Sequence, residues 1–143
     1  MKLSKLVFLA TILLITACTE PFVTIPGGQL KGKAVSAPSS WDSVSEVVQL
    51  EVRPSDPYSL NIWAVTDSGN LYVATTDSKW VGFIADNDEV RVKIEKKLHE
   101  LHAVHVDDTE ELARIVAAYT KKYEVDPSDN WVEGANVYRL VTR

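Results

Sequence analysis

The chain has 143 residues and a formal net charge of −5 at pH 7, with 15 basic and 20 acidic side chains. This acidic balance argues against a nucleic-acid-binding protein and against a domain that lies flat on anionic lipid, because both partners are negatively charged. A single cysteine, Cys18, excludes an intramolecular disulfide, and the length suits one domain with its own hydrophobic core.

The amino-terminal residues have the parts of a secretory signal peptide. Lys2 and Lys5 give a positive start, and an uncharged run follows over residues 6–17. A helix needs about 20 apolar residues to cross the hydrocarbon core of a bilayer, so this run is too short to span one. Its length suits the apolar region of a signal peptide. We predict that residues 1–17 are removed, which takes the net charge from −5 to −7 because two lysines leave.

The sequence Ile15-Thr16-Ala17-Cys18 resembles the lipobox of bacterial lipoproteins. The resemblance implies that Cys18 becomes the first mature residue and carries lipid on its sulfur and amino group, and several acyl chains anchor a protein stably. A plain cleaved signal with an incidental cysteine is the alternative, although a lone thiol is unusual in an oxidising compartment. Thr19 stands where aspartate usually marks inner-membrane retention. In a Gram-negative cell this indicates the periplasmic face of the outer membrane.

Composition divides the remaining chain in two. Residues 18–40, after the cut, are rich in proline, glycine, serine and other small residues without sustained periodicity, which is typical of a tether. Residues 22–25 could instead add a short strand. Residues 41–143 carry regular patterns and form the predicted domain.

Several short segments of the domain alternate between apolar and polar residues, as half-buried strands do. Prolines at 54 and 57 end the first segment, because proline lacks the N–H that a strand ladder uses. An Asp-Ser-Gly-Asn cluster at 67–70 predicts a β-hairpin. Residues 79–85 fit either a short helix or an irregular turn. The predicted strands are 44–52, 60–65, 71–75, 90–94, 98–106 and 136–141.

A change to three- and four-residue spacing predicts one main helix over about residues 108–123. Asp107 and Glu110 are spaced as in a capping box, and acidic residues suit the start of a helix. The apolar stripe of this helix consists of Leu112, Ile115, Val116, Tyr119 and Tyr123. Five to six mainly antiparallel strands and one helix predict an α+β fold, a small β-barrel with the helix against one side.

Three histidines in the strand 98–106 raise the question of a metal site. Side chains of a strand alternate between its faces, so His99 and His105 share one face and His102 points the other way. At about 3.3 Å per residue, His99 and His105 stand roughly 20 Å apart, whereas zinc ligands lie within about 2.1 Å of the ion. The acidic cluster at 86–89 lacks EF-hand spacing and is interpreted as a solvated turn. We predict no metal site.

Residues 61–81 contain two hairpin strands, a short polar loop and Trp80, and this pattern resembles the split β-barrel flavin-binding superfamily. That superfamily includes pyridoxamine-phosphate-oxidase-like proteins and deazaflavin-dependent nitroreductases. The likeness extends over roughly residues 47–125. It implies a split barrel, a homodimer and a site for FMN or a deazaflavin at the dimer interface.

The resemblance also implies which residues contact the cofactor. Hydroxyls and a cation suit a phosphate, and an aromatic face can stack on a flavin ring. The candidate ligand-binding residues are Arg53, Trp63, Thr75, Thr76, Ser78, Lys79 and Trp80. A core role for Trp63 and Trp80, with an ordinary turn at residues 75–79, is the alternative.

Two functions therefore remain open. The first is a lipid-anchored envelope protein whose split barrel serves as a small-ligand-binding or structural module. The second is a flavin- or deazaflavin-dependent oxidoreductase, in which the protein would hold the ring and the cofactor would transfer the hydride. The chain offers no Gly-x-Ser-x-Gly or Gly-x-x-x-x-Gly-Lys motif, which disfavours a triad hydrolase or a nucleotide phosphate loop.

Overall fold

A computed structural model describes residues 27–126 and 134–143 of the chain. The predicted signal peptide, Cys18 and the first part of the expected tether lie outside these residues. The described elements are β1 (Lys33–Ala34), β2 (Val47–Val52), β3 (Tyr58–Asp67), β4 (Asn70–Thr75), α1 (Lys79–Asp86), β5 (Glu89–Ile94), β6 (Lys97–His105), α2 (Thr109–Tyr123) and β7 (Asn136–Thr142). Neither helix is long and apolar enough to cross a membrane.

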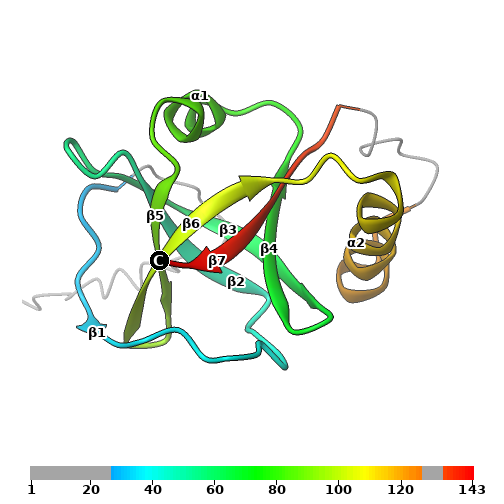
Figure 1. Cartoon of the computed structure of the whole chain (residues 1–143), viewed down its shortest axis with the longest axis horizontal. Helices are drawn as coiled ribbons and strands as arrows, with labels where there is room; N and C mark the ends of the chain where they lie inside the picture. Colours follow the sequence, from blue (N-terminus) through cyan, green and yellow to red (C-terminus); the bar gives the residue numbers. More distant parts are fainter. Residues whose placement is uncertain (1–26, 127–133) are drawn as a thin grey trace, which may run out of the picture.

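Six strands form a closed antiparallel barrel, shown in Figure 1. The strand order is β2-β3-β4-β7-β6-β5, and the pairing of β5 with β2 closes the ring. The short strand β1 adds to β6 in parallel. Closure removes the unpaired strand edges that an open sheet would present. The predicted α+β fold, a small split barrel, is confirmed.

The hairpin between β3 and β4 forms where the sequence predicts it. Asp67 pairs with Asn70, so only Ser68 and Gly69 form the turn. Both have positive φ, 50° and 77°, as a two-residue type I′ turn requires. The segment whose structure the sequence leaves open, residues 79–85, is helical and forms α1.

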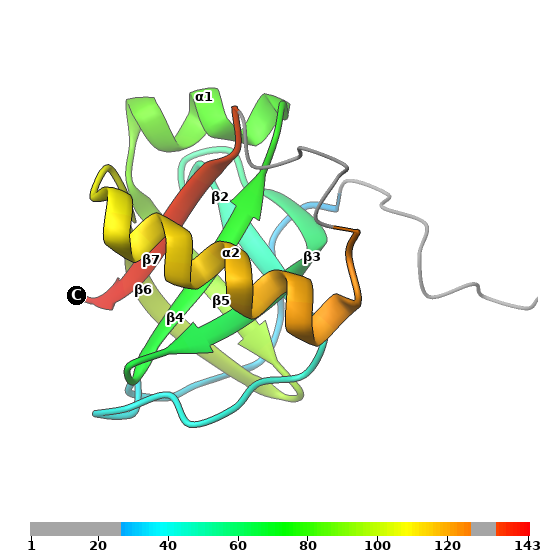
Figure 2. The same ribbon diagram turned by 90° about the vertical axis from the view of Figure 1, so that its right-hand side faces the viewer.

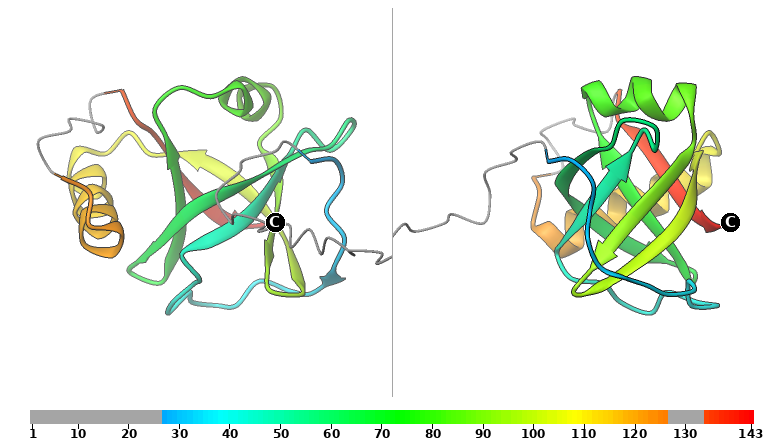
Figure 3. Two further views of the ribbon diagram at one scale, coloured as in Figure 1. Left: turned by 180° about the vertical axis from the view of Figure 1, so that it is seen from behind. Right: turned by 90° about the vertical axis from the view of Figure 1, so that its left-hand side faces the viewer.

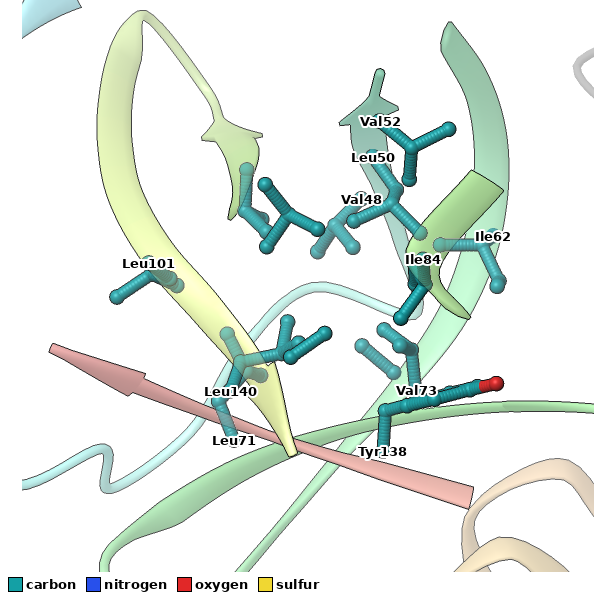
Figure 4. Close-up of a cluster of buried hydrophobic side chains, with 14 of the residues drawn as sticks. Val48, Leu50, Val52, Ile62, Leu71, Val73, Ile84, Leu101, Tyr138 and Leu140 are labelled. Atoms are coloured by element: carbon teal, nitrogen blue, oxygen red, sulfur yellow. The ribbon is translucent and has the colours of Figure 1, made fainter. Parts of the chain in front are cut away.

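The barrel interior is the main hydrophobic core, shown in Figure 4. Alternation along β2 turns Val48, Leu50 and Val52 inward, and each is at most 1% exposed. The helix α1 closes one end of the barrel with Trp80 and Ile84. The chain between β1 and β2 crosses the opposite end (Figure 1).

The helix α2 packs on the outside of the barrel, as Figure 2 shows, and creates a second core there. Its apolar stripe meets the outward-facing Val65, Tyr72 and Val137. The N-cap is Asp108, whose side chain accepts a hydrogen bond from the Glu111 backbone N–H. The expected capping box at Asp107 was therefore one residue too early.

Residues 27–40, assigned to the tether by composition, instead belong to the folded domain. Figure 3 shows the segment running along the outside of the barrel. Gly27 pairs with Ser59, and β1 pairs with β6. The Leu30 backbone N–H donates to Glu51, a carboxylate that is 3% exposed and is also paired with Arg91. Composition alone missed this contact because the partners are distant in sequence.

Candidate functional site

The three histidines do not converge. His99 is 5% exposed and packs against Trp41 at the barrel end, with ring centroids 5.1 Å apart. His102 pairs with Asp88, and His105 pairs with Asp107. Among the described residues, no group of three or more His, Cys, Asp or Glu side chains could hold a metal ion.

Three of the candidate ligand contacts lie together at one cavity. Trp63 on β3, Thr75 at the end of β4 and Thr76 just after it line a cavity of about 680 Å³. This volume falls in the range of about 300–1,000 Å³ that is usual for small-molecule sites. Ala74 on β4 also lines it. The remaining lining residues are at the carboxyl end of α2 or just after it: Tyr119, Tyr123, Glu124, Val125 and Asp126.

Aromatic rings form one wall of this cavity. The Trp63 and Tyr123 rings stack with centroids 4.4 Å apart and an interplanar angle of 8°. The Tyr119 ring stacks on Tyr123 at 5.6 Å and 26°. Trp63 remains 43% exposed, because β3 turns its neighbours Ile62 and Ala64 inward and Trp63 outward. A planar ligand can therefore extend an aromatic stack that the protein has already assembled.

Both tyrosine hydroxyls are engaged with the backbone of β3. The Tyr119 hydroxyl donates to the Trp63 carbonyl at 3.1 Å. The Tyr123 hydroxyl lies 2.7 Å from the Ala64 carbonyl and accepts from the Ala64 N–H at 3.0 Å. Burial raises the pKa of Tyr119 well above its usual range and raises the pKa of Tyr123 to about 12. The tyrosine rings therefore support Trp63 from within the stack, and neither phenol serves as a base near neutral pH.

The charged groups at the cavity are acidic. Glu124 and Asp126 line it, and no lysine, arginine or histidine does so among the described residues. Lys122 does not line the cavity. Its ammonium donates to the carbonyls of Val44, Ser45 and Ala64 at 2.8–3.2 Å and lies 5.3 Å from the centroid of the Tyr123 ring.

The other four candidate residues do not line this cavity. Arg53 pairs with Asp56 at 3.0 Å, and its guanidinium lies 4.2 Å from the centroid of the Phe83 ring on α1. Ser78 is the N-cap of α1, and Lys79 begins that helix. Trp80 is 1% exposed and packs near Tyr138 in the barrel core. Trp80 therefore has the core role that was the alternative to a ligand contact.

These positions do not provide the phosphate clamp that the resemblance implies. Thr75 and Thr76 supply hydroxyls, but the only charges lining their cavity in the described chain are two carboxylates. These carboxylates would repel a phosphate, and no cation among the described lining residues offsets them. The described lining of this cavity therefore suits a planar ring better than the phosphate of FMN.

Sequence reasoning missed Tyr119, Tyr123 and Glu124 as site residues. The two tyrosines were assigned to an apolar stripe facing the core, since they lie four residues apart on a helix. That assignment is correct for Tyr119, which is 3% exposed, and incomplete for Tyr123, which is only partly buried and stacks on Trp63. The unused signal was the pair of tyrosines at the end of a helix, followed at once by acidic residues.

Comparisons with known proteins show the fold. No protein-family model matches the chain, and no curated protein matches its sequence. Solved structures do match. A FAD-binding protein from Mesorhizobium loti gives a TM-score of 0.54 at 14% identity, covering 69% of this chain and 80% of that one. A candidate pyridoxamine 5′-phosphate oxidase from Listeria innocua gives 0.56 at 17% identity, covering 68% and 83%.

A NimC/NimA family protein from Clostridium acetobutylicum gives a TM-score of 0.53 at 17% identity, covering 66% of this chain and 73% of that one. Identities this low carry the fold and not the ligand, because one fold supports many functions. The chain thus has the split-barrel fold that these solved structures share.

Proposed function

We propose that this protein is a lipid-anchored protein of the cell envelope whose split barrel is a small-ligand-binding module. The observation that carries the proposal is the cavity of about 680 Å³ at Trp63, Tyr119 and Tyr123, where a stack of aromatic rings meets two threonine hydroxyls. Apolar lining with a few polar groups is what small-molecule sites usually have.

A binding role fits this cavity better than catalysis. Its two tyrosine hydroxyls are engaged with backbone groups, and their pKa values are raised by burial, so neither supplies a base. A flavin- or deazaflavin-dependent oxidoreductase is the second candidate. It is favoured by the likeness to the FAD-binding protein and by the Trp63 ring, which could stack on an isoalloxazine.

An absorbance spectrum of the purified protein, followed by titrations with riboflavin and FMN, separates these two functions. We expect a colourless protein that binds FMN no more tightly than riboflavin, since the cavity lacks a cation for the phosphate. Bound yellow cofactor, or FMN binding at least tenfold tighter than riboflavin and weakened by Lys79→Gln, would establish the oxidoreductase instead. A Lys97→Gln variant, which alters an exposed lysine on β6, is the matched control.

The anchoring part of the proposal rests on the signal-like residues 1–17 and the lipobox-like sequence before Cys18. In a Gram-negative cell, Thr19 favours the periplasmic face of the outer membrane. Replacing Cys18 with serine should move the protein from the membrane fraction to the soluble fraction. Thr19→Ser, which leaves the lipobox intact, should stay with the membrane. A Cys18→Ser protein that still sediments with membranes would refute the anchor.

A further inference from the structure

The aromatic cavity has an electrostatic character that specifies its ligand more narrowly. We infer that it binds an organic cation, a quaternary ammonium or protonated amine group, rather than a neutral or anionic ring. The inference rests on the proposed binding function and adds the charge of the ligand to it. Three features of the cavity carry it: the ring faces, the acidic lining and the position of the end of α2.

The ring faces come first. Trp63, Tyr119 and Tyr123 all line the cavity, and Trp63 leaves 43% of its side chain exposed. The face of an aromatic ring is the negative region of its quadrupole, and tryptophan attracts cations most strongly. Tyr123 stacks on both of the other rings and Tyr119 is 3% exposed, so Trp63 is the ring that a cation can best reach.

The acidic lining is the second feature. Glu124 and Asp126 lie at the cavity, with no basic side chain among its described lining residues. The Glu124 carboxylate gives this surface a negative potential that favours a cation and disfavours a phosphate or carboxylate. Thr75 and Thr76 add neutral hydroxyls, which can accept hydrogen bonds from an amine.

The third feature is the helix terminus. The 15-residue helix α2 ends at Tyr123, directly before Glu124 and Val125, which line the cavity. A helix carries the equivalent of about half a negative charge at its carboxyl end, where its last carbonyls lack helical partners. The ammonium of Lys122 donates to three carbonyls, two of them from residues 44 and 45, and lies 5.3 Å from the centroid of the Tyr123 ring, so it offsets part of this charge.

A matched pair of probes tests the charge directly. Choline carries a trimethylammonium group, and 3,3-dimethylbutan-1-ol has the same shape with carbon in place of nitrogen. Each is titrated into the isotopically labelled protein and followed by nuclear magnetic resonance, which reports the affinity and the residues that respond. We expect choline to bind about tenfold tighter or more, from the strength of cation–π contacts, and to shift the Trp63 indole N–H but not that of Trp41.

Substitutions at the cavity, compared with a control elsewhere, separate the effect of the cavity's charge on binding from an effect on the fold. Glu124→Gln should weaken choline binding about three- to tenfold without changing the binding of the alcohol, as expected for loss of one nearby charge. Glu95→Gln is the matched control, because Glu95 has nearly the same positive φ, 56° against 53°, and lies in the β5–β6 turn. Trp63→Leu should weaken both probes.

The outcomes distinguish the inference from the function on which it rests. Equal affinity for the two probes at the Trp63 site would keep the binding module and overturn the choice of a cation. Shifts from choline that are confined to other residues would overturn the inference. Binding of neither probe, together with no response of Trp63 to riboflavin, would overturn both proposals.

Discussion

The Trp63 and Tyr123 rings stack at 4.4 Å, and their contact marks the point where β3 changes partners. β3 pairs with β2 up to Trp63 and with β4 from Ala64 onward. The Tyr123 hydroxyl fills the resulting gap in the ladder, bonding to Ala64 and to the Glu46 carbonyl. One residue of α2 thus completes the barrel wall and shapes the cavity beside it.

Removing this hydroxyl should destabilise the domain. Tyr123→Phe keeps the ring stack but removes the hydrogen bonds of the hydroxyl. The Ala64 carbonyl still accepts from Lys122, and the Ala64 N–H still reaches the Glu46 carbonyl at 3.4 Å, so we expect a cost of about 0.5–1.5 kcal/mol in the free energy of unfolding. Urea denaturation measures the loss. Tyr58→Phe, which preserves the ring that packs edge-on against Phe83, is the control and should cost clearly less. Equal losses in the two variants would contradict the bridging role.

The free energy of unfolding should decrease as the pH rises through the alkaline range. Burial is the largest cause that raises the pKa of both Tyr72 and Tyr123 from 10.0 to about 12. Between these values the unfolded chain loses protons that the folded chain retains, so rising pH favours unfolding there. Below pH 10 both states are protonated and the stability is fully present.

Phenolate absorbance during a pH titration measures these pKa values. Tyr72→Phe and Tyr123→Phe should each flatten the fall in stability above pH 10 relative to the parent protein. The comparison with the parent matters because burial lowers the pKa of Lys122, which acts in the opposite direction. Ionisation of all five tyrosines near pH 10 in the folded protein would show the idea to be wrong.

The ion pair between Glu51 and Arg91 should be sensitive to the loss of either partner. Arg91 donates to both carboxylate oxygens of Glu51, at 2.7 and 2.8 Å, under the segment that contains Leu30. Glu51→Gln leaves Arg91 without its counterion and should cost about 3 kcal/mol. The double variant Glu51→Leu with Arg91→Met should recover part of that loss, since neither charge is then left unpaired.

Denaturant titrations of Glu51→Leu, Arg91→Met and the double variant measure the coupling between these residues. Arg53→Met is the control, because its partner Asp56 is 80% exposed in the side chain and an exposed pair contributes about 1 kcal/mol or less. Additive effects of the two single substitutions would mean that the pair is not coupled.

Substituting alanine for each of two glycines should change the free energy of unfolding in opposite directions. Gly69 has a φ of 77°, and a Cβ there would lie 2.7 Å from the Ser40 hydroxyl oxygen, so Gly69→Ala should cost about 1–3 kcal/mol. Gly82 lies inside α1 with open space around it, so Gly82→Ala should gain about 0.5–1 kcal/mol. Thermal unfolding of both variants checks this, and a stabilising Gly69→Ala would contradict the turn geometry.

The sequence by itself predicted most of the local structure. Alternating residues located the barrel strands, the cluster at 67–70 located the hairpin, and helical spacing located α2. These patterns are readable because each depends on residues two to four positions apart, which share one face of an element. The same patterns could not decide residues 79–85, where a short amphipathic segment fits two conformations.

Only the tertiary structure decided which candidate residues meet. Trp63 faces outward and Trp80 fills the core because the barrel gives β3 an outer face and places α1 over one end. The packing of α2 brings Tyr123 to Trp63, and the pairing of β1 with β6 draws residues 27–40 into the domain. These contacts join residues far apart in the chain, and their free energy comes from burial and hydrogen bonds that exist only after the barrel has closed.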